Sequence, residues 1–223
     1  MNRNPALSHV RILDFTWVLA GPYGTRLLAD FGAEVIKVQP VTASEPDDPF
    51  ERGYYAAWNR NKRSVTLNMN QPEGIALAKK LIAISDVVIE NFTPRVMANW
   101  GLTYPEMKTI KPDIIMVSMS AFGQTGPKRD YAGFAPTIQA ASGLTGLMTS
   151  PTGEPLGPGF SLADHVAGLY ADMAVLAALE QRHKTGGEGR HIDISQQEAM
   201  MSFLGGEFLD YQRTGKTPVS PDT

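Results

Sequence analysis

The residue whose type and position most directly suggest chemistry is Asp164. It stands at the start of a long apolar stretch of helical periodicity, and the Gly/Pro-rich segment 149–160 precedes it. A carboxylate in the first turn of a helix is held ionised by the helix N-terminus, and we expect it to be partly exposed. Such a group is able to attack an activated acyl group as a nucleophile. The alternative, an acid that only complements the helix dipole, is equally compatible with this position.

Residues that follow two expected strands form a second candidate group. Residues 15–20 follow the strand 10–14, and Asn91 and Phe92 follow the strand 86–90. The carboxyl ends of parallel strands form the edge of the sheet where ligands bind. There Asn91 would hold an amide or a ribose, and Phe92 would cover a planar ring. A turn asparagine and a core phenylalanine remain the alternative interpretation.

Basic residues form a third group. Arg60, Lys62 and Arg63 are clustered in the chain, and Lys37 ends another expected strand. Clustered cations near strand ends suit phosphate groups, although a solvated basic turn has the same composition. The four histidines have no spacing with acidic residues that would predict a zinc or iron site.

The elements that must position these residues alternate between strand and helix. We expect strands at 10–14, 34–38, 64–67, 86–90, 114–120 and 191–194. We expect helices at 21–32, 72–84, 94–100, 105–110, 134–147, 161–184 and 195–213, with surface loops at 40–53 and 214–223. This order predicts an α/β fold with a doubly wound, Rossmann-like parallel sheet.

The composition limits the class of protein. The chain has 223 residues, enough for one domain with a substantial core, and its formal net charge of −3 argues against a general nucleic-acid binder. It has no cysteine, which excludes disulfides and thiolate nucleophiles. We see neither an N-terminal signal core nor an apolar run long enough to span a membrane. We therefore expect a cytoplasmic protein.

Several ordered blocks of the sequence resemble the class III CoA-transferase family, also called the CaiB/BaiF family. The resemblance extends from about Val10 to Arg213. The matching segments are Leu13–Thr16, Ala20–Pro22, Asp30–Val38, Asn59–Ser64, Glu90–Phe92, Gly123–Pro127, Asp164 and Lys184–Arg190.

This resemblance implies an activity. Members of the family move CoA from an acyl-CoA donor to a carboxylic acid acceptor, and the aspartate matching Asp164 attacks the thioester. A mixed aspartyl anhydride and then an aspartyl-CoA thioester form in turn, which divides one difficult step into several easier ones. Coenzyme A is carried as the substrate, and no metal is expected.

The resemblance also implies which residues contact CoA. They are Val18, Leu19, Ala20, Lys37, Leu67, Asn91 and Phe92, with Lys62 and Arg63 as weaker phosphate neighbours. Some members carry basic residues where this chain has Gln39-Pro40, Asn70 and Asn99. Formyl-CoA transferases have glutamine at the position of Leu19, so a bulkier or less polar acyl group is expected here.

Two rival functions stay open. The related α-methylacyl-CoA racemases have a Gly-His-Asp run where this chain reads Gly133-Phe134-Ala135, so the proton-exchanging residues of a racemase are missing. The family fold, in which two chains interlock, also has a C-terminal portion that returns to complete the large domain. We therefore expect residues 1–213 to be the N-terminal CoA-binding portion and residues 214–223 to begin a linker or a disordered tail. A non-catalytic CoA-binding or partner subunit is the second rival, and a homodimer or association with a missing portion is expected.

Overall fold

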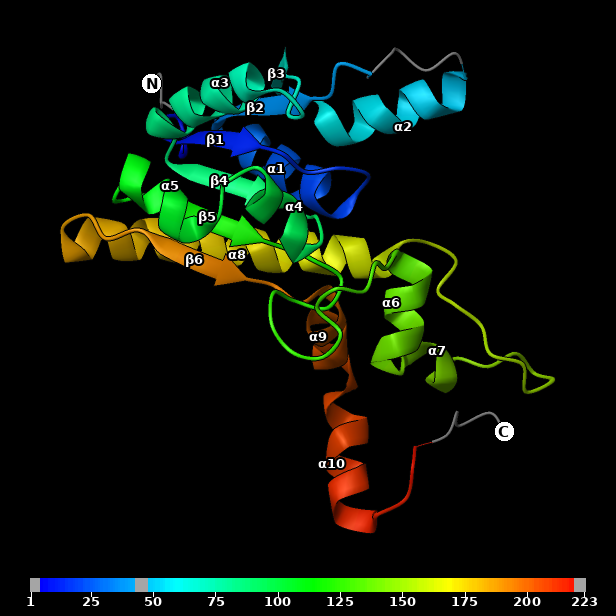
Figure 1. The fold of residues 1–223 in the computed structure, drawn as a ribbon. Helices are drawn as coiled ribbons and strands as arrows, with labels where there is room; N and C mark the ends of the chain where they lie inside the picture. Colours follow the sequence, from blue (N-terminus) through cyan, green and yellow to red (C-terminus); the bar gives the residue numbers. More distant parts are fainter. Residues whose placement is uncertain (1–4, 43–47, 219–223) are drawn as a thin grey trace.

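A computed structural model of the chain describes residues 5–42 and 48–218. Within these ranges the strands form one six-stranded sheet in which every neighbouring pair is parallel (Figure 1). The strands are β1 (Arg11–Asp14), β2 (Glu34–Gln39), β3 (Arg63–Thr66), β4 (Val87–Glu90), β5 (Ile115–Ser118) and β6 (Arg190–Asp193). The expected α/β fold with a parallel sheet is confirmed.

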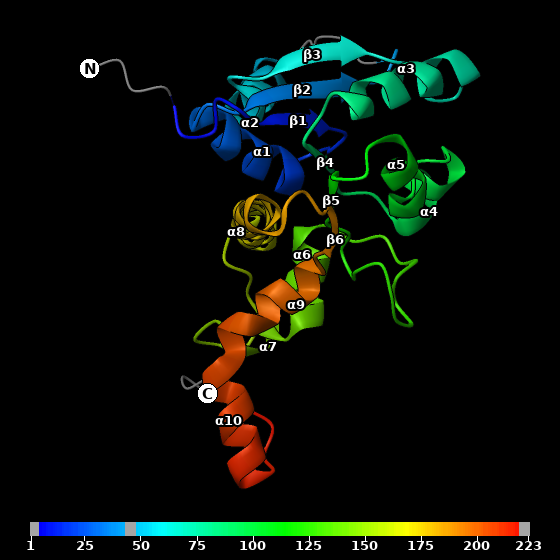
Figure 2. The same ribbon diagram turned by 90° about the vertical axis from the view of Figure 1, so that its left-hand side faces the viewer.

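Helices connect the strands and continue beyond the last one. They are α1 (Ala20–Asp30), α2 (Pro49–Asn59), α3 (Pro72–Ala83), α4 (Pro94–Asn99), α5 (Tyr104–Ile110), α6 (Ala135–Ser142), α7 (Leu144–Leu147), α8 (Leu162–Thr185), α9 (Gln196–Met201) and α10 (Gly205–Thr214). Figure 2 shows α1 and α8 against one face of the sheet and α3, α4 and α5 against the other.

The order of the strands fixes where a ligand would bind. It is β3-β2-β1-β4-β5-β6, so the chain proceeds outward from β1 in one direction and outward from β4 in the other. The loops that leave β1 and β4 therefore diverge to opposite faces of the sheet. A crevice forms between them at the carboxyl edge, which is the usual ligand site of doubly wound sheets.

Two apolar layers hold the sheet between its helices. On one face, residues of β1, β4 and β5 pack with α1 and α8, as in the contacts of Ile12, Leu28 and Val175. On the other face, Leu13 and Val88 pack against Ile82 of α3 and Met107 of α5. Because these central strands are buried on both sides, β4 and β5 are apolar except at their last residues, Glu90 and Ser118.

Helices α1 and α8 cross at two glycines. A Cβ atom placed on Gly168 would lie 2.9 Å from the carbonyl oxygen of Ala20 and 3.3 Å from the amide nitrogen of Gly24. A Cβ on Gly24 would in turn lie 3.1 Å from the carbonyl oxygen of Gly168. The two backbones therefore approach as closely as they do because neither residue has a side chain.

The prediction of a surface loop over residues 40–53 is wrong from residue 49 onward. Helix α2 begins at Pro49, and the Asp48 carboxylate accepts a hydrogen bond from the Phe50 amide at 2.8 Å as its N-cap. The helix buries none of its residues completely, so it gave no clear apolar stripe. An aspartate followed by proline is nevertheless a helix-start signal that the sequence contained. Residues 43–47 of that loop lie outside the described residues.

Two expected helices are interrupted. The helix expected at 134–147 is divided at Gly143, whose φ of 97° ends α6 before α7 begins. The helix expected at 195–213 narrows to a 3-10 turn at residues 202–204, directly before Gly205-Gly206. Consecutive glycines are poor helix formers, which favours a break at this point. Helix α10 then projects away from the sheet (Figures 1 and 2).

Helix α8 differs from the expectation about membrane spans. Among the described residues it is the one helix long and apolar enough to cross a membrane by length and composition, with 44% of that window buried inside the fold. Its buried residues pack against α1 and the sheet, as those of a core helix do.

The predicted boundary at 213 and 214 remains a prediction. Helix α10 ends at Thr214, and Thr217 and Pro218 line a small cavity with Phe208 and Tyr211. Residues 219–223 of the expected tail lie outside the described residues.

Candidate active site

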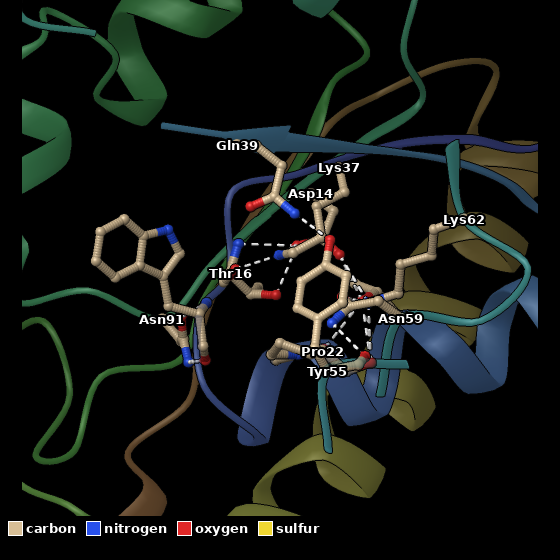
Figure 3. A network of polar contacts seen from close by, with 12 residues as sticks. Asp14, Thr16, Pro22, Lys37, Gln39, Tyr55, Asn59, Lys62 and Asn91 are labelled. Carbon is tan, nitrogen blue, oxygen red and sulfur yellow. Dashed lines mark hydrogen bonds and ion pairs between the residues drawn. The ribbon is translucent and has the colours of Figure 1, made fainter. Parts of the chain in front are cut away.

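A buried aspartate organises the carboxyl end of β1. Asp14 is fully buried, and its Oδ1 accepts hydrogen bonds from the amide and the hydroxyl of Thr16 at 2.8 and 2.6 Å. Its Oδ2 accepts from the hydroxyl of Thr25 at 2.7 Å and pairs with the Lys62 ammonium at 3.1 Å. The Lys37 ammonium lies 3.6 Å from Oδ1 (Figure 3). One carboxylate thus connects β1 and β2 with α1 and the approach to β3.

The charges of this cluster shift its pKa values in opposite directions. Burial acts to raise the pKa of Asp14, but the ammonium groups of Lys37 and Lys62 and the two threonine hydroxyls outweigh it and hold the pKa well below its usual range. Burial lowers the pKa of Lys62 to about 8, against the attraction of Asp14. At neutral pH Asp14 is therefore ionised and Lys62 is mostly protonated.

Three side chains fix the loop that follows β1. Besides Asp14, Lys37 donates to the carbonyl oxygen of Thr16. Asn91 from the end of β4 clamps Trp17: its Oδ1 accepts from the Trp17 amide at 2.7 Å, and its Nδ2 donates to the Trp17 carbonyl at 2.8 Å. The next residue, Val18, has a φ of 61°, which is costly for a β-branched residue. The surrounding hydrogen bonds hold the loop in this strained conformation.

A cavity of about 280 Å³ lies at the carboxyl ends of β1 to β4. We call it the aromatic cavity, because Phe15, Trp17, Phe92 and Trp100 line it together with Leu67, Met69 and the amide side chains of Gln39, Asn68 and Asn70. The ring of Phe92 meets Trp17 edge to face at 5.9 Å and Trp100 at 5.6 Å. Flat rings with amides at their border suit a planar heterocycle.

A second cavity, of about 270 Å³, adjoins the first. Both are lined by Trp17, Gln39 and Pro40. We call this one the tyrosine cavity, because Tyr54 and Tyr55 of α2 line it opposite Val18 and Lys37. Figure 3 shows Tyr55 in front of the Asp14 cluster, where Gln39 donates to its hydroxyl. The two cavities share Trp17, Gln39 and Pro40 in their walls, and we refer to the pair as the channel.

A row of aromatic rings joins the tyrosine cavity to the neighbourhood of Asp164. Asp164 stands in the first turn of α8 and is partly exposed, as expected. Tyr54, which lines the tyrosine cavity, packs against Trp58 at 5.9 Å, and Trp58 packs against His165, the residue after Asp164, at 5.5 Å. The charge of Asp164 also acts on Tyr54 and adds to the rise that burial causes in the pKa of that phenol.

The pKa of Asp164 is higher than the position at a helix N-terminus leads one to expect. Burial raises its pKa from 3.8 to about 6, and the charge of His165 only partly opposes this. A shift of this size corresponds to about 3 kcal/mol, whereas a helix N-terminus contributes about 0.3–1 kcal/mol. Desolvation therefore outweighs the helix dipole, and the carboxylate is more basic than an ordinary aspartate.

Aromatic rings enclose the residue next to Asp164. The ring of His165 packs edge to face against Tyr23 at 4.7 Å, Trp58 at 5.5 Å and Phe160 at 5.7 Å. Its Nδ1 lies 2.7 Å from the carbonyl oxygen of Ser161, which orients the imidazole. These rings therefore pack around the start of α8, directly beside the half-buried carboxylate.

The structure brings most of the predicted CoA-contact residues to this channel. Leu67 and Phe92 line the aromatic cavity, Val18 and Lys37 line the tyrosine cavity, and Asn91 fixes the loop between them. Leu19 and Ala20 are buried at the start of α1, where they face the core.

The two weaker predictions, Lys62 and Arg63, lie elsewhere. The Lys62 side chain is 2% exposed, and its ammonium group donates to Asp14, to Asn59 and to the carbonyl oxygen of Pro22. Arg63 is 80% exposed and pairs with Glu34, at the amino end of β2. Neither cation lines the two cavities. The Lys62 ammonium pairs with the buried Asp14 carboxylate, and Arg63 lies at the amino edge of the sheet, opposite the edge that carries the cavities.

Sequence reasoning assigned no role to three residues of the channel. Trp17 lies between both cavities, Asp14 anchors the loop, and Tyr54 approaches Asp164. Trp17 lay in the predicted strand-end group, and a strand that ends in aspartate was a signal for Asp14. Tyr54 could not be found because its helix was not predicted. Within the described residues no three His, Asp or Glu side chains gather closely enough to hold a metal ion.

Comparison with known proteins gives a consistent result. A family model described as CoA-transferase family III matches residues 7–222. Among curated proteins, the succinate–glutarate CoA-transferase of Agrobacterium fabrum is 36% identical over 98% of this chain. The human succinyl-CoA:glutarate CoA-transferase is 40% identical over 97%.

A solved structure agrees with these relatives. A CaiB/BaiF family protein from Brucella suis superposes with a TM-score of 0.91 at 35% identity over 98% of this chain. The present chain spans 58% and 51% of the two curated relatives and 60% of the Brucella chain.

Proposed function

The chain belongs to CoA-transferase family III, and we propose that it forms the CoA-binding part of an enzyme that moves CoA from an acyl-CoA to a carboxylic acid, with Asp164 as the nucleophile. The observation that carries this proposal is the position of Asp164. A half-buried carboxylate of raised pKa stands at a helix start, beside a channel along the carboxyl edge of a parallel sheet.

The proposed reaction needs no group other than a carboxylate and the thiol of CoA. The Asp164 carboxylate attacks the thioester carbonyl, and CoA leaves as thiolate while an aspartyl anhydride forms. The thiolate attacks the aspartyl carbonyl of the anhydride, which releases the donor acid and leaves an aspartyl-CoA thioester. The acceptor carboxylate then repeats these two steps in reverse order, so that a new acyl-CoA forms and Asp164 is regenerated.

The environment of Asp164 supports this role. A pKa of about 6 leaves the carboxylate about nine-tenths ionised at pH 7, and it makes the carboxylate more basic than an exposed aspartate. The aromatic rings around His165 keep water from the neighbourhood. Exclusion of water matters here because an anhydride or a thioester on Asp164 would otherwise hydrolyse.

The channel supports CoA as the ligand. We propose that the aromatic cavity holds the adenine ring between Phe92, Trp17 and Leu67. The pantetheine arm would then extend through the tyrosine cavity past Val18 toward Tyr54 and Asp164. The described cations near this channel are engaged within the protein, so we expect backbone amides and amide side chains to contact the phosphates.

The substrates are proposed by analogy with the relatives. Both curated relatives carry names that include succinate or succinyl-CoA together with glutarate. We propose short dicarboxylic acids as donor and acceptor, with succinyl-CoA as the first donor to test.

The experiment is trapping of the acyl-enzyme. The chain is incubated with succinyl-CoA and then with hydroxylamine, and peptides are analysed by mass spectrometry. A hydroxamate on Asp164 is expected. The Asp164→Asn variant should lose exchange of labelled succinate into succinyl-CoA by at least about 10³-fold, because no other group can carry the acyl chain.

A control variant separates chemistry from folding. Asp113→Asn changes a carboxylate at the amino edge of the sheet, where it pairs with Lys111, and should leave the labelling unchanged. Unmodified Asp164 together with tight binding of CoA would contradict the catalytic proposal and favour a CoA-binding subunit.

A further inference from the structure

A second buried carboxylate lies beneath the aromatic cavity, and the proposed reaction does not use it. Glu90 ends β4 and is 1% exposed. Its Oε2 accepts a hydrogen bond from the backbone amide of Phe92 at 2.7 Å. Burying a carboxyl group at this depth is costly unless hydrogen bonds compensate. The side chain thus has a specific partner, and this partner is in the wall of the proposed CoA site.

Two more side chains lie between this contact and the protein surface. Ser118 lies opposite Glu90 in the β4–β5 pairing, close enough that its hydroxyl lowers the pKa of the Glu90 carboxyl. The same hydroxyl oxygen lies 3.0 Å from Nε2 of His191 on β6. His191 is exposed and stacks on Tyr104 of α5, with ring centroids 5.4 Å apart. Glu90, Ser118 and His191 therefore follow one another on adjacent strands, from the Phe92 amide to a solvent-exposed imidazole.

The groups around these three side chains favour two protonation states near neutral pH. Burial raises the pKa of Glu90 to about 7, the Ser118 hydroxyl and the Phe92 amide oppose this, and the charge of Asp193 adds to it. Burial also lowers the pKa of His191, against Asp193. Asp193 itself accepts the Gln124 amide at 3.0 and 3.1 Å. From α5, Tyr104 faces His191, and from the adjoining turn and strand the charges of Glu188 and Arg190 act on Tyr104.

The segment held by Glu90 decides the shape of the aromatic cavity. Phe92 contacts both Trp17 and Trp100, so its position sets the spacing of all three rings. The adjacent Asn91 clamps Trp17 from the same turn. Glu90 holds the backbone of Phe92, and Asn91 holds the backbone of Trp17. Two consecutive side chains therefore fix this wall of the aromatic cavity.

We propose that Glu90 is a positioning residue for the acyl-CoA site: its carboxyl group holds the Phe92 amide, and with it the aromatic wall, while Ser118 and His191 connect that carboxyl to solvent. This inference rests on the proposed binding of CoA in the aromatic cavity. When Glu90 is ionised, Ser118 donates to it and accepts from His191. When Glu90 is protonated, these directions reverse, and the Phe92 amide loses its charged acceptor.

The test measures the wall and the ligand separately. Glu90→Met removes the acceptor, whereas Glu90→Gln keeps an oxygen for the Phe92 amide and cannot ionise. Calorimetric titration with CoA should give a dissociation constant about tenfold higher for Glu90→Met at pH 7, and one within about threefold of the unchanged chain for Glu90→Gln. Amide hydrogen exchange at Phe92 should rise about tenfold in Glu90→Met and stay protected in Glu90→Gln.

The pH profile distinguishes positioning from simple packing. Between pH 6 and 8 the affinity of the unchanged chain should increase about threefold relative to Glu90→Gln, because an ionised acceptor holds the amide more strongly. Ser118→Ala should weaken this dependence while Phe92 stays protected. Glu34→Gln, at the amino edge of the sheet, is the matched control and should behave as the unchanged chain.

Each outcome bears on one proposal. Unaltered CoA affinity and unaltered Phe92 exchange in Glu90→Met would overturn the positioning role. If Glu90→Met does not fold, a pH dependence in Ser118→Ala and Glu90→Gln identical to that of the unchanged chain would overturn it instead. Absence of CoA binding by the unchanged chain would count against the proposed function, and Phe92 exchange would still decide whether Glu90 holds this segment.

Discussion

The crossing of α1 and α8 allows a stability prediction with its own internal control. Gly168→Ala adds one methyl group to the interior of α8, where it would meet backbone atoms of α1 at 2.9 and 3.3 Å and the Tyr23 ring at 2.8 Å. Alanine favours a helix over glycine by about 1 kcal/mol. Overpacking against a neighbour costs about 1–3 kcal/mol, and a helix backbone yields less than a side chain does. The net result should be destabilisation by up to about 2 kcal/mol.

The control is a glycine-to-alanine substitution at a position where the added Cβ atom meets no neighbour. A Cβ on Gly53, inside α2, would have no atom within 4 Å. Gly53→Ala should therefore stabilise the protein by about 0.5–1 kcal/mol. Urea denaturation followed by circular dichroism measures both free energies of unfolding. Equal stability of the two variants, or a Gly168→Ala protein more stable than the unchanged chain, would refute the close crossing.

The remaining predictions concern buried charges. Lys62→Met leaves Asp14 with one fewer cation and should reduce the free energy of unfolding by about 3–5 kcal/mol. Arg63→Met removes an exposed ion pair and should change the free energy of unfolding by less than about 1 kcal/mol. Equal effects of the two substitutions in urea titrations would contradict the buried cluster. Burial raises the pKa of Asp172 from 3.8 to about 8, so the folded state keeps a proton that the unfolded state releases, and stability should fall as the pH rises from about 4 to 8. Asp172→Asn should remove a large part of that decline, and an unchanged pH profile in thermal melts would show that the group titrates normally.

The alternation of strands and helices, and therefore the sheet and its ligand-binding edge, could be predicted from the sequence because each central strand has a short apolar run, with polar residues only at its ends. Helix α2 could not be predicted from apolar spacing, because it lies on the surface and buries no residue completely. Because α2 was not predicted, Tyr54 and Tyr55 were not among the expected site residues. A helix that is held at a few contacts leaves little pattern in its sequence.

The candidate site was predictable in its position more than in its electrostatics. Asp164, Asn91 and Phe92 could be identified because they stand at element ends. Lys62 does not line the cavities because it pairs with Asp14, which is 48 residues distant in the chain. Likewise, the basicity of Asp164 arises from its burial in the folded chain. Such shifts come from tertiary contacts that no local pattern contains.

The composition of the Asp14 cluster has a consequence for how an anion reaches the channel. One carboxylate lies between two lysines, so the cluster carries an excess of one positive charge, in a chain whose formal net charge is −3. Because both ammonium groups are almost completely shielded from solvent, mobile ions attenuate their field less than that of a surface lysine. Because Lys37 also lines the tyrosine cavity, the field of the two ammonium groups favours the approach of an anion to the mouth of that cavity.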